Sequence, residues 1–146
     1  MEQGRREEMR LEMDSLSENE EFARVVVAVF LSRLNPTLEE IDDVKTAVSE
    51  AATNAVIHGY KGEAGTIYMD ITAQSGEETS LTVCVRDAGI GIPDVKQAME
   101  PMYTTDTSGE RSGMGFSFME AFMDQVQVES EPGRGTLVTM KKFIGR

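Results

Sequence analysis

Alternation of apolar and polar residues marks the strands of this chain. Met9, Leu11 and Met13 are separated by charged residues, and this period of two predicts a first strand near the N-terminus. The same alternation runs through residues 67–73 and 81–85, with the polar sequence SGEE as a turn between them. Apolar residues at alternate positions on both sides of the sequence EPGRG predict a closing hairpin.

A helical period follows the first strand. Ser17, with Glu20 three residues later, has the form of a capping box, which satisfies free N–H groups at a helix start. The helix is predicted to end near Leu34, because an Asn-Pro pair comes next and the residue before a proline disfavours the helical conformation. Its apolar residues recur at helical spacing: Phe22, Val25, Val26, Val29 and Phe30.

A second helix is predicted directly after the first. Thr37 and Glu40 repeat the capping pattern at its start. Its apolar stripe runs from Ile41 to Ala55, and Gly59 is a natural stop. The sequence FSFMEAFMD predicts a third, short helix before the closing hairpin.

The order of these elements predicts an α+β fold. Helices are expected to pack on one face of a mixed, mostly antiparallel sheet, as a two-layer sandwich. The chain has 146 residues and shows no internal repeat or linker, so residues 1–146 are assigned to a single domain. Residues 87–115 are rich in glycine and longer than an ordinary connection, which indicates a functional loop.

Charge narrows the classes of partner. The formal net charge is −12, which argues against a protein that neutralises nucleic-acid phosphates with a basic face. The charge fits solubility alone, and it also fits attraction to a basic protein partner. Composition does not separate these two explanations.

Location is expected from what the sequence lacks. No apolar run approaches the length of a membrane span, and the opening sequence MEQGRREEMR has no apolar core of a secretory signal. Cys84 is the only cysteine, so an internal disulfide is excluded. We therefore expect a cytoplasmic protein that binds neither membrane nor nucleic acid.

The second helix carries two polar side chains on a segment that otherwise reads as buried. Glu50 and Asn54 are four residues apart, so they share one helix face. An Asn oxygen can serve as the protein ligand of a Mg²⁺ ion that is otherwise bound by phosphates and water. A nearby carboxylate could accept a proton from an attacking hydroxyl. Taken alone, the pair is more typical of a solvated helix face, and His58 one turn later is interpreted as a structural residue.

Two glycine motifs flank the long loop. Asp87, at a strand end, is followed by Gly89 and Gly91, and such a carboxylate can accept hydrogen bonds from an amino group. Gly113 and Gly115 come directly before the third helix, where backbone N–H groups suit a phosphate. An ordinary turn would explain either motif by itself. The phosphate-binding pattern G-x-x-x-x-G-K-[ST] is absent from the sequence.

In combination and in this order, the motifs resemble the ATP-binding fold shared by gyrase, the heat-shock chaperone of ninety kilodaltons, histidine kinases and MutL. The resemblance covers nearly the whole chain. It implies that Glu50 is a catalytic base, that Asn54 binds Mg²⁺ and that Asp87 meets the adenine amino group of ATP. It places the other nucleotide-pocket and lid residues at Gly89, Gly91, Thr104, Thr105, Arg111, Ser112, Gly113, Gly115 and Thr136. Arg111 is the candidate for the charge of the γ-phosphate.

Longer strings narrow the resemblance. SENEEFAR, SEAATNAVIHGY, PMYTT and ERSGMGF are similar to protein-serine kinases that act as anti-sigma factors in sporulation. This implies a homodimer that holds a sporulation sigma factor with ATP bound. It also implies phosphorylation of a serine on an anti-anti-sigma protein, with Glu20 and Arg24 as partner-binding residues.

Two other functions stay open from the residues. The chain could be an anti-sigma binding module that uses ATP only as a structural ligand, although pure binding would not need the carboxylate of Glu50. It could also be a kinase or ATPase of the same fold that switches a different antagonist. Nothing in the composition separates this last function from that of a sporulation anti-sigma kinase. Only the longer strings do.

Overall fold

The structure is a computed structural model, and it describes residues 4–100 and 115–146. Its elements follow the predicted order. They are β1 (Arg6–Asp14), α1 (Asn19–Leu31), the 3-10 helix η1 (Ser32–Leu34), α2 (Leu38–Asn54), the π-helix η2 (Ala55–Gly59), β2 (Thr66–Gln74), β3 (Ser80–Asp87), α3 (Val95–Ala98), α4 (Gly115–Phe122), β4 (Gln125–Glu131) and β5 (Gly135–Phe143).

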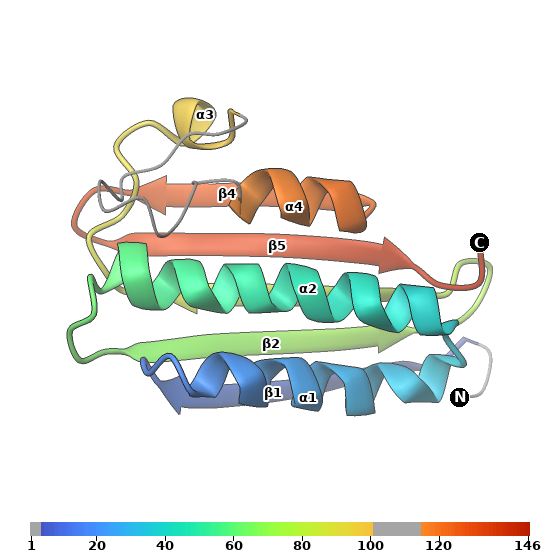
Figure 1. The fold of residues 1–146 in the computed structure, drawn as a ribbon. Helices are drawn as coiled ribbons and strands as arrows, with labels where there is room; N and C mark the ends of the chain where they lie inside the picture. The colour runs from blue at the N-terminus through green and yellow to red at the C-terminus, as the bar shows by residue number, and fades with distance from the viewer. Residues whose placement is uncertain (1–3, 101–114) are drawn as a thin grey trace.

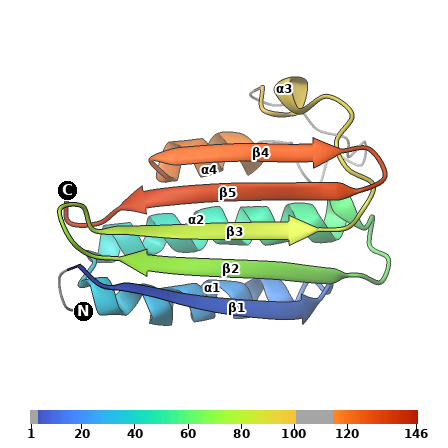
Figure 2. The same cartoon turned by 180° about the vertical axis from the view of Figure 1, so that it is seen from behind.

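The strands form one sheet in the order β1-β2-β3-β5-β4, and each of these neighbouring pairs is antiparallel. Figure 1 shows α1, α2 and α4 lying across one face of the sheet. Seen from behind, the opposite face carries no helix from the described residues (Figure 2). The predicted α+β sandwich with helices on one face is therefore confirmed. None of the described helices is long and apolar enough to cross a membrane.

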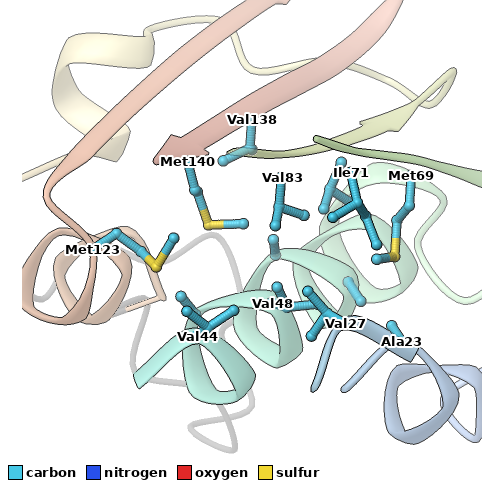
Figure 3. Packing of buried hydrophobic residues seen from close by; sticks show 14 of the residues in the cluster. Ala23, Val27, Val44, Val48, Met69, Ile71, Val83, Met123, Val138 and Met140 are labelled. Atoms are coloured by element: carbon cyan, nitrogen blue, oxygen red, sulfur yellow. The ribbon is translucent and has the colours of Figure 1, made fainter. Parts of the chain in front are cut away.

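The core lies between the sheet and the helices. Inward side chains of the central strands, such as Ile71 and its cross-strand partner Val83, are fully buried. They meet Val27 from α1 and Val48 from α2 (Figure 3). Full burial of such a side chain stabilises the fold by about 1.5–3 kcal/mol. This packing fixes α2 against the sheet, and the end of α2 carries the predicted site residues.

The two predicted capping boxes have different outcomes. Thr37 has the extended backbone that an N-cap needs, and its hydroxyl accepts from the Glu40 N–H at 3.1 Å, so this box is confirmed. The predicted Ser17 box is wrong. The N-cap of α1 is Glu18, in a helical conformation and without a side-chain cap. The carbonyl of Ser17 already accepts from the Glu20 N–H in a preceding turn, and the Glu20 carboxylate turns to Ser49 instead.

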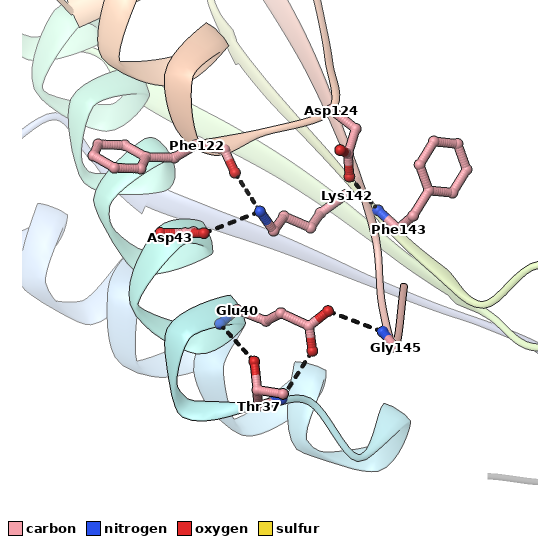
Figure 4. Close-up of polar contacts among 8 residues, drawn as sticks. All are labelled: Thr37, Glu40, Asp43, Phe122, Asp124, Lys142, Phe143 and Gly145. Carbon is pink, nitrogen blue, oxygen red and sulfur yellow. Dashed lines mark hydrogen bonds and ion pairs between the residues drawn. The ribbon is translucent and has the colours of Figure 1, made fainter.

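The start of α2 is also fastened to the C-terminal segment. One oxygen of Glu40 accepts from the Thr37 N–H at 2.8 Å, and the other accepts from the Gly145 N–H at 2.9 Å (Figure 4). Lys142 on β5 reaches Asp43 at 3.1 Å, and its ammonium group also donates to a carbonyl at the end of α4. Burial alone would raise the pKa of Glu40, but the hydrogen bonds outweigh burial and lower this pKa below its usual value. These contacts hold α2, β5 and α4 together.

Candidate functional site

A cavity of about 280 Å³ opens where α2 ends and β3 ends. Its walls are mostly apolar, with a few polar groups between them. The apolar side chains are Ala51, Ala55, Val85, Ile90, Ile92, Pro93, Ala98, Phe116 and Val138. The polar side chains are Asn54, His58, Lys61, Asp87 and Thr136. Such a site suits a flat, largely apolar ring that carries a few hydrogen-bonding groups.

Asp87 is the buried acid of this cavity. Its side chain ends β3 and is only 6% exposed. Burial raises its pKa, while backbone hydrogen bonds from Gly89 and Thr136 and the charge of Arg86 oppose that rise. The Gly89 N–H donates to its Oδ1 at 2.9 Å. A carboxylate fixed in this way can accept a hydrogen bond from an amino group in the cavity.

Two glycines are required by close backbone contacts beside Asp87. A Cβ on Gly89 would lie 2.0 Å from the carbonyl oxygen of Gly59. Gly91 has a φ of 77°, and a Cβ there would lie 2.1 Å from the carbonyl oxygen of Glu131. Larger residues could not adopt this path without moving the loop. The glycines predicted to shape the pocket therefore let the loop after β3 run between η2 and the β4–β5 hairpin.

Hydroxyl groups connect the same loop to the β4–β5 hairpin. Ser130 accepts from the Ile92 N–H at 2.7 Å, and its oxygen lies 2.9 Å from the hydroxyl of Thr136. Ser130 also hydrogen-bonds the carbonyl of Gly135 at 2.9 Å. Thr136 lines the cavity as the sequence predicted, whereas Ser130 was not predicted. Ser130 alternates with Val126 and Val128 on the partly buried side of β4, and a single serine at such a position carries no signal of this role.

Of the two predicted helix residues Glu50 and Asn54, Asn54 alone is among the described residues that line the cavity. Asn54 is the last residue of α2 and lines the cavity. Glu50, one turn earlier, is half-buried and is not among the described cavity-lining residues. The helix then continues as the π-helix η2, a form that is frequent at functional sites. In this segment His58, which sequence reasoning interpreted as structural, lies on the cavity wall.

The predicted phosphate lid falls largely outside the described residues. These predicted residues are Thr104, Thr105, Arg111, Ser112 and Gly113. Gly115, predicted to come directly before the third helix, is the first residue of α4, and the next residue, Phe116, lines the cavity. Among the described residues, no group of three or more histidine, cysteine or acidic side chains could hold a metal ion.

The predicted partner-binding residues lie on α1, and neither of them lines the cavity. An oxygen of Glu20 accepts from the Ser49 hydroxyl at 3.0 Å and lies 3.4 Å from Nε of Arg24. Ser49 belongs to α2 and directly precedes Glu50, so the partner-binding pair contacts the helix that carries the site. Next to this pair, Phe22, Val25 and Val29 form an exposed apolar stripe, at 66%, 53% and 63% exposure.

Cavity residues that were not predicted lacked a distinctive signal. Ile90, Ala98 and Phe116 are ordinary core-type residues in sequence, and only the fold shows that they border a cavity. Lys61 also lines it, with a positive φ of 53° that is uncommon outside glycine. No sequence pattern predicts a positive φ at this lysine.

Comparisons with known proteins agree with this geometry. Residues 14–142 match the model of the histidine kinase-like ATPase domain family. The chain is 56% identical over 134 residues to the protein named Anti-sigma F factor from Clostridium acetobutylicum, with 92% of each chain covered. It is 54% identical over 140 residues to the Anti-sigma F factor of Pasteuria penetrans, covering 96% of this chain and 93% of that one.

Solved structures show the same fold. A structure of the RsbU and RsbW domains of a Mycobacterium tuberculosis protein superposes with a TM-score of 0.66 at 19% identity. The match covers 94% of this chain and 32% of that one. The catalytic domain of histidine kinase ThkA gives 0.51 at 17% identity, covering 93% and 96%. The fold and the sequence relatives together confirm the resemblance, so the chain belongs to the histidine kinase-like ATPase domain family and, within it, to the anti-sigma F factors.

Proposed function

We propose that this protein is a serine kinase that holds a sporulation sigma factor while ATP is bound, and phosphorylates a serine on an anti-anti-sigma antagonist. The observation that carries the proposal is the buried carboxylate of Asp87 in an apolar cavity that also contains Asn54. Family membership and the name of the relatives, Anti-sigma F factor, support the same function.

The cavity fits the adenine ring of ATP. Its apolar walls match the faces of a flat ring, and Asp87 offers a hydrogen-bond acceptor to the exocyclic amine. The backbone N–H groups of Gly89 and Thr136 hold that carboxylate in place. Guanine has a carbonyl oxygen where adenine has the amine, so the same acceptor favours ATP over GTP.

The phosphates would extend from the adenine toward the end of α2 and the start of α4. Asn54 would hold Mg²⁺ through its amide oxygen, and the ion would supply positive charge to the phosphates. The start of α4 at Gly115 offers backbone N–H groups to phosphate oxygens. Arg111 is proposed to balance the charge of the γ-phosphate, with Thr104 and Thr105 in the same lid.

Glu50 would take part in the chemical step. The serine hydroxyl of the antagonist attacks the γ-phosphorus, a new O–P bond forms and the bond to the β–γ bridging oxygen breaks, which releases ADP. Glu50 accepts or orients the proton of the hydroxyl, a role that contributes typically 10²–10⁴-fold to the rate. Positioning and charge stabilisation provide most of the remaining catalysis.

Partners would bind through the N-terminal half. Glu20 and Arg24 present a charged pair on α1, beside the exposed apolar stripe of Phe22, Val25 and Val29. Edge strand β1 pairs only with β2 among the described strands, and a free strand edge invites pairing with a second chain. We propose that β1 and α1 help to build a homodimer, with Arg24 reaching carboxylates of the sigma factor and the antagonist.

The test is a phosphorylation assay. The protein is incubated with labelled ATP, Mg²⁺ and an anti-anti-sigma protein, and the phosphorylated residue is identified by mass spectrometry. Label on a serine of the antagonist supports the proposal. A protein that binds ATP and sigma factor but transfers no label would instead be a binding module. That second function has one observation in its favour, because Glu50 is not among the described residues that line the cavity.

A further inference from the structure

Tyr60 connects the end of η2 to the loop that follows Asp87. It follows directly after η2 and is half-buried. Its hydroxyl donates to the carbonyl of Thr66 at 2.6 Å and accepts from the Ala88 N–H at 2.8 Å. A phenol has one proton to donate and can accept in return, so this pair of contacts uses its hydrogen-bonding capacity well.

The tyrosine ring is held in one position by the chain beneath it. A Cβ on Gly65 would lie 2.4–2.6 Å from carbon atoms of the Tyr60 ring, so the ring packs directly on the Gly65 backbone. The Tyr60 N–H also donates to the carbonyl of Ala55 at 2.9 Å, a bond five residues back that belongs to the π-helical turn. The hydroxyl is therefore placed by contacts on both sides of it.

A second bond runs parallel to the first. The Ile90 N–H donates to the carbonyl of Gly59 at 2.9 Å. Two consecutive residues, Gly59 and Tyr60, thus bind the backbone at positions 88 and 90. Between these positions the Gly89 N–H holds the carboxylate of Asp87 at 2.9 Å. Residues 88–90, which orient the Asp87 carboxylate, are therefore held at both ends by hydrogen bonds to Tyr60 and Gly59.

We propose that Tyr60 is a positioning residue that sets nucleotide-base specificity by holding the Asp87 loop. The inference rests on the proposed function, because it assigns a role within the adenine site. Tyr60 itself is not among the residues that line the cavity. It acts on the base through Ala88 and Asp87, and losing its hydroxyl frees the Ala88 end of the loop.

The test compares Tyr60→Phe with Tyr68→Phe as a matched control. Tyr68 lies on β2, is not among the described residues that line the cavity, and has Arg86 stacked 3.9 Å from its ring centre. The control therefore removes the same atom but keeps the ring that Arg86 contacts. Titrations with ATP and GTP measure the affinity ratio of the two nucleotides. Tyr60→Phe is expected to weaken ATP binding about five- to tenfold, the scale of one lost hydrogen bond, with a much smaller effect on GTP. Tyr68→Phe should leave the ratio unchanged.

A merely structural tyrosine would lower the melting temperature without changing that ratio. Combining Tyr60→Phe with Asp87→Asn gives a second readout, because the tyrosine should matter little once the carboxylate is gone. An unchanged ATP-to-GTP ratio in folded Tyr60→Phe would overturn the inference and leave the proposed function standing. A wild-type protein with equal affinity for ATP and GTP would overturn the adenine site itself.

Two measurements keep the inference testable if Tyr60→Phe does not fold. Gly65→Ala pushes on the ring without removing the hydroxyl, and it should reproduce the loss of ATP preference. Hydrogen exchange on the wild-type protein should show a protected Ala88 amide although this residue is exposed. Exchange at the rate of a free amide would contradict the Tyr60 bond.

Discussion

The carboxylate of Asp87 lies against the backbone of Gly59. A Cβ on Gly59 would stand 2.8 Å from Cγ of Asp87, closer than side chains can approach. The end of η2 and the end of β3 therefore meet without an intervening side chain. This contact explains how an acid on a strand can form one wall of a cavity with a helix that is distant in sequence.

Asp87→Asn is expected to separate stability from binding. Burial in the folded protein raises the pKa of Asp87, which means that the fold disfavours the charged carboxylate. At neutral pH the charged side chain therefore lowers the stability of the folded protein. The amide removes that cost while keeping an oxygen for the Gly89 N–H. The melting temperature at pH 7 should stay the same or rise, and the difference should vanish below about pH 3.8, where both side chains are neutral.

The same variant should bind ATP about ten- to a hundredfold more weakly, the scale of a hydrogen bond to a charged group. GTP should bind no worse, because the new amide can donate to its carbonyl oxygen. Calorimetry with both nucleotides, next to thermal melts at several pH values, checks the two parts. Unchanged ATP affinity would contradict the role of Asp87 in the site.

Glu50→Gln and Asn54→Ala should separate chemistry from nucleotide binding. Asn54 lines the cavity, so its loss is expected to weaken Mg²⁺-dependent binding of ATP. Glu50 lies one turn before Asn54 and is not among the described residues that line the cavity. Its amide variant should retain ATP binding but lose about a hundredfold or more in phosphoryl transfer. Titrations and a kinase assay on both variants decide the matter. A fully active Glu50→Gln protein would rule out the proposed base.

The sequence allowed the fold to be predicted because its patterns were local. Alternation on β1, β2 and β3 and the Thr37 box depend on neighbouring residues, and each led to the right element. The failed Ser17 cap shows the limit of such patterns, since Glu20 makes its contact with Ser49, 29 residues away in sequence. A local pattern cannot show that a distant side chain will compete for a capping group.

The residues of the candidate site also fall into those that local motifs could predict and those that depend on distant contacts. Asn54, Asp87 and Thr136 could be chosen because their motifs match a family pattern, and all three line one cavity. Tyr60 and Ser130 support that cavity through hydrogen bonds across the fold, and a single Tyr or Ser has no sequence context that predicts such bonds. Residues that support the site are therefore visible only once the loop after β3 has been placed.

Glu40 should make stability sensitive to acid. Its pKa is lowered in the fold, so the stability that its charge contributes is present above its unfolded value, near 4.5, and is lost as the pH falls through the folded value. Glu40→Gln should cost about 1 kcal/mol at pH 7, the scale of one lost hydrogen bond, because glutamine has one oxygen for the N–H groups of Thr37 and Gly145. The cost should be much smaller once the pH has fallen below the lowered pKa of Glu40 in the folded protein. Denaturant unfolding at several pH values measures this. Glu39→Gln, at an exposed neighbour, is the matched control.

Arg24→Ala is expected to weaken both protein partners while sparing the nucleotide. Arg24 lies on α1 beside Glu20, away from the cavity lining, and its side chain is 37% exposed. A guanidinium can bind a partner carboxylate through two parallel hydrogen bonds. If that pair becomes buried in the complex, its loss costs on the order of 2–5 kcal/mol, against under about 1 for a contact at an exposed rim.

The measurement is capture of sigma factor and of antagonist by the variant, run beside an ATP titration and sedimentation. Arg134→Ala in the turn between β4 and β5, whose side chain is 82% exposed, is the matched control. Capture of both partners should fall with Arg24→Ala alone, with ATP affinity and the sedimentation coefficient unchanged. Because Glu20 also binds Ser49 on α2, Glu20→Gln should weaken partner capture in the same direction by freeing Arg24 from its fixed position. Full capture of sigma factor by Arg24→Ala would mean that Arg24 is an ordinary solvent-exposed residue with no role in partner binding. A simultaneous loss of ATP binding would mean that the substitution had damaged the fold.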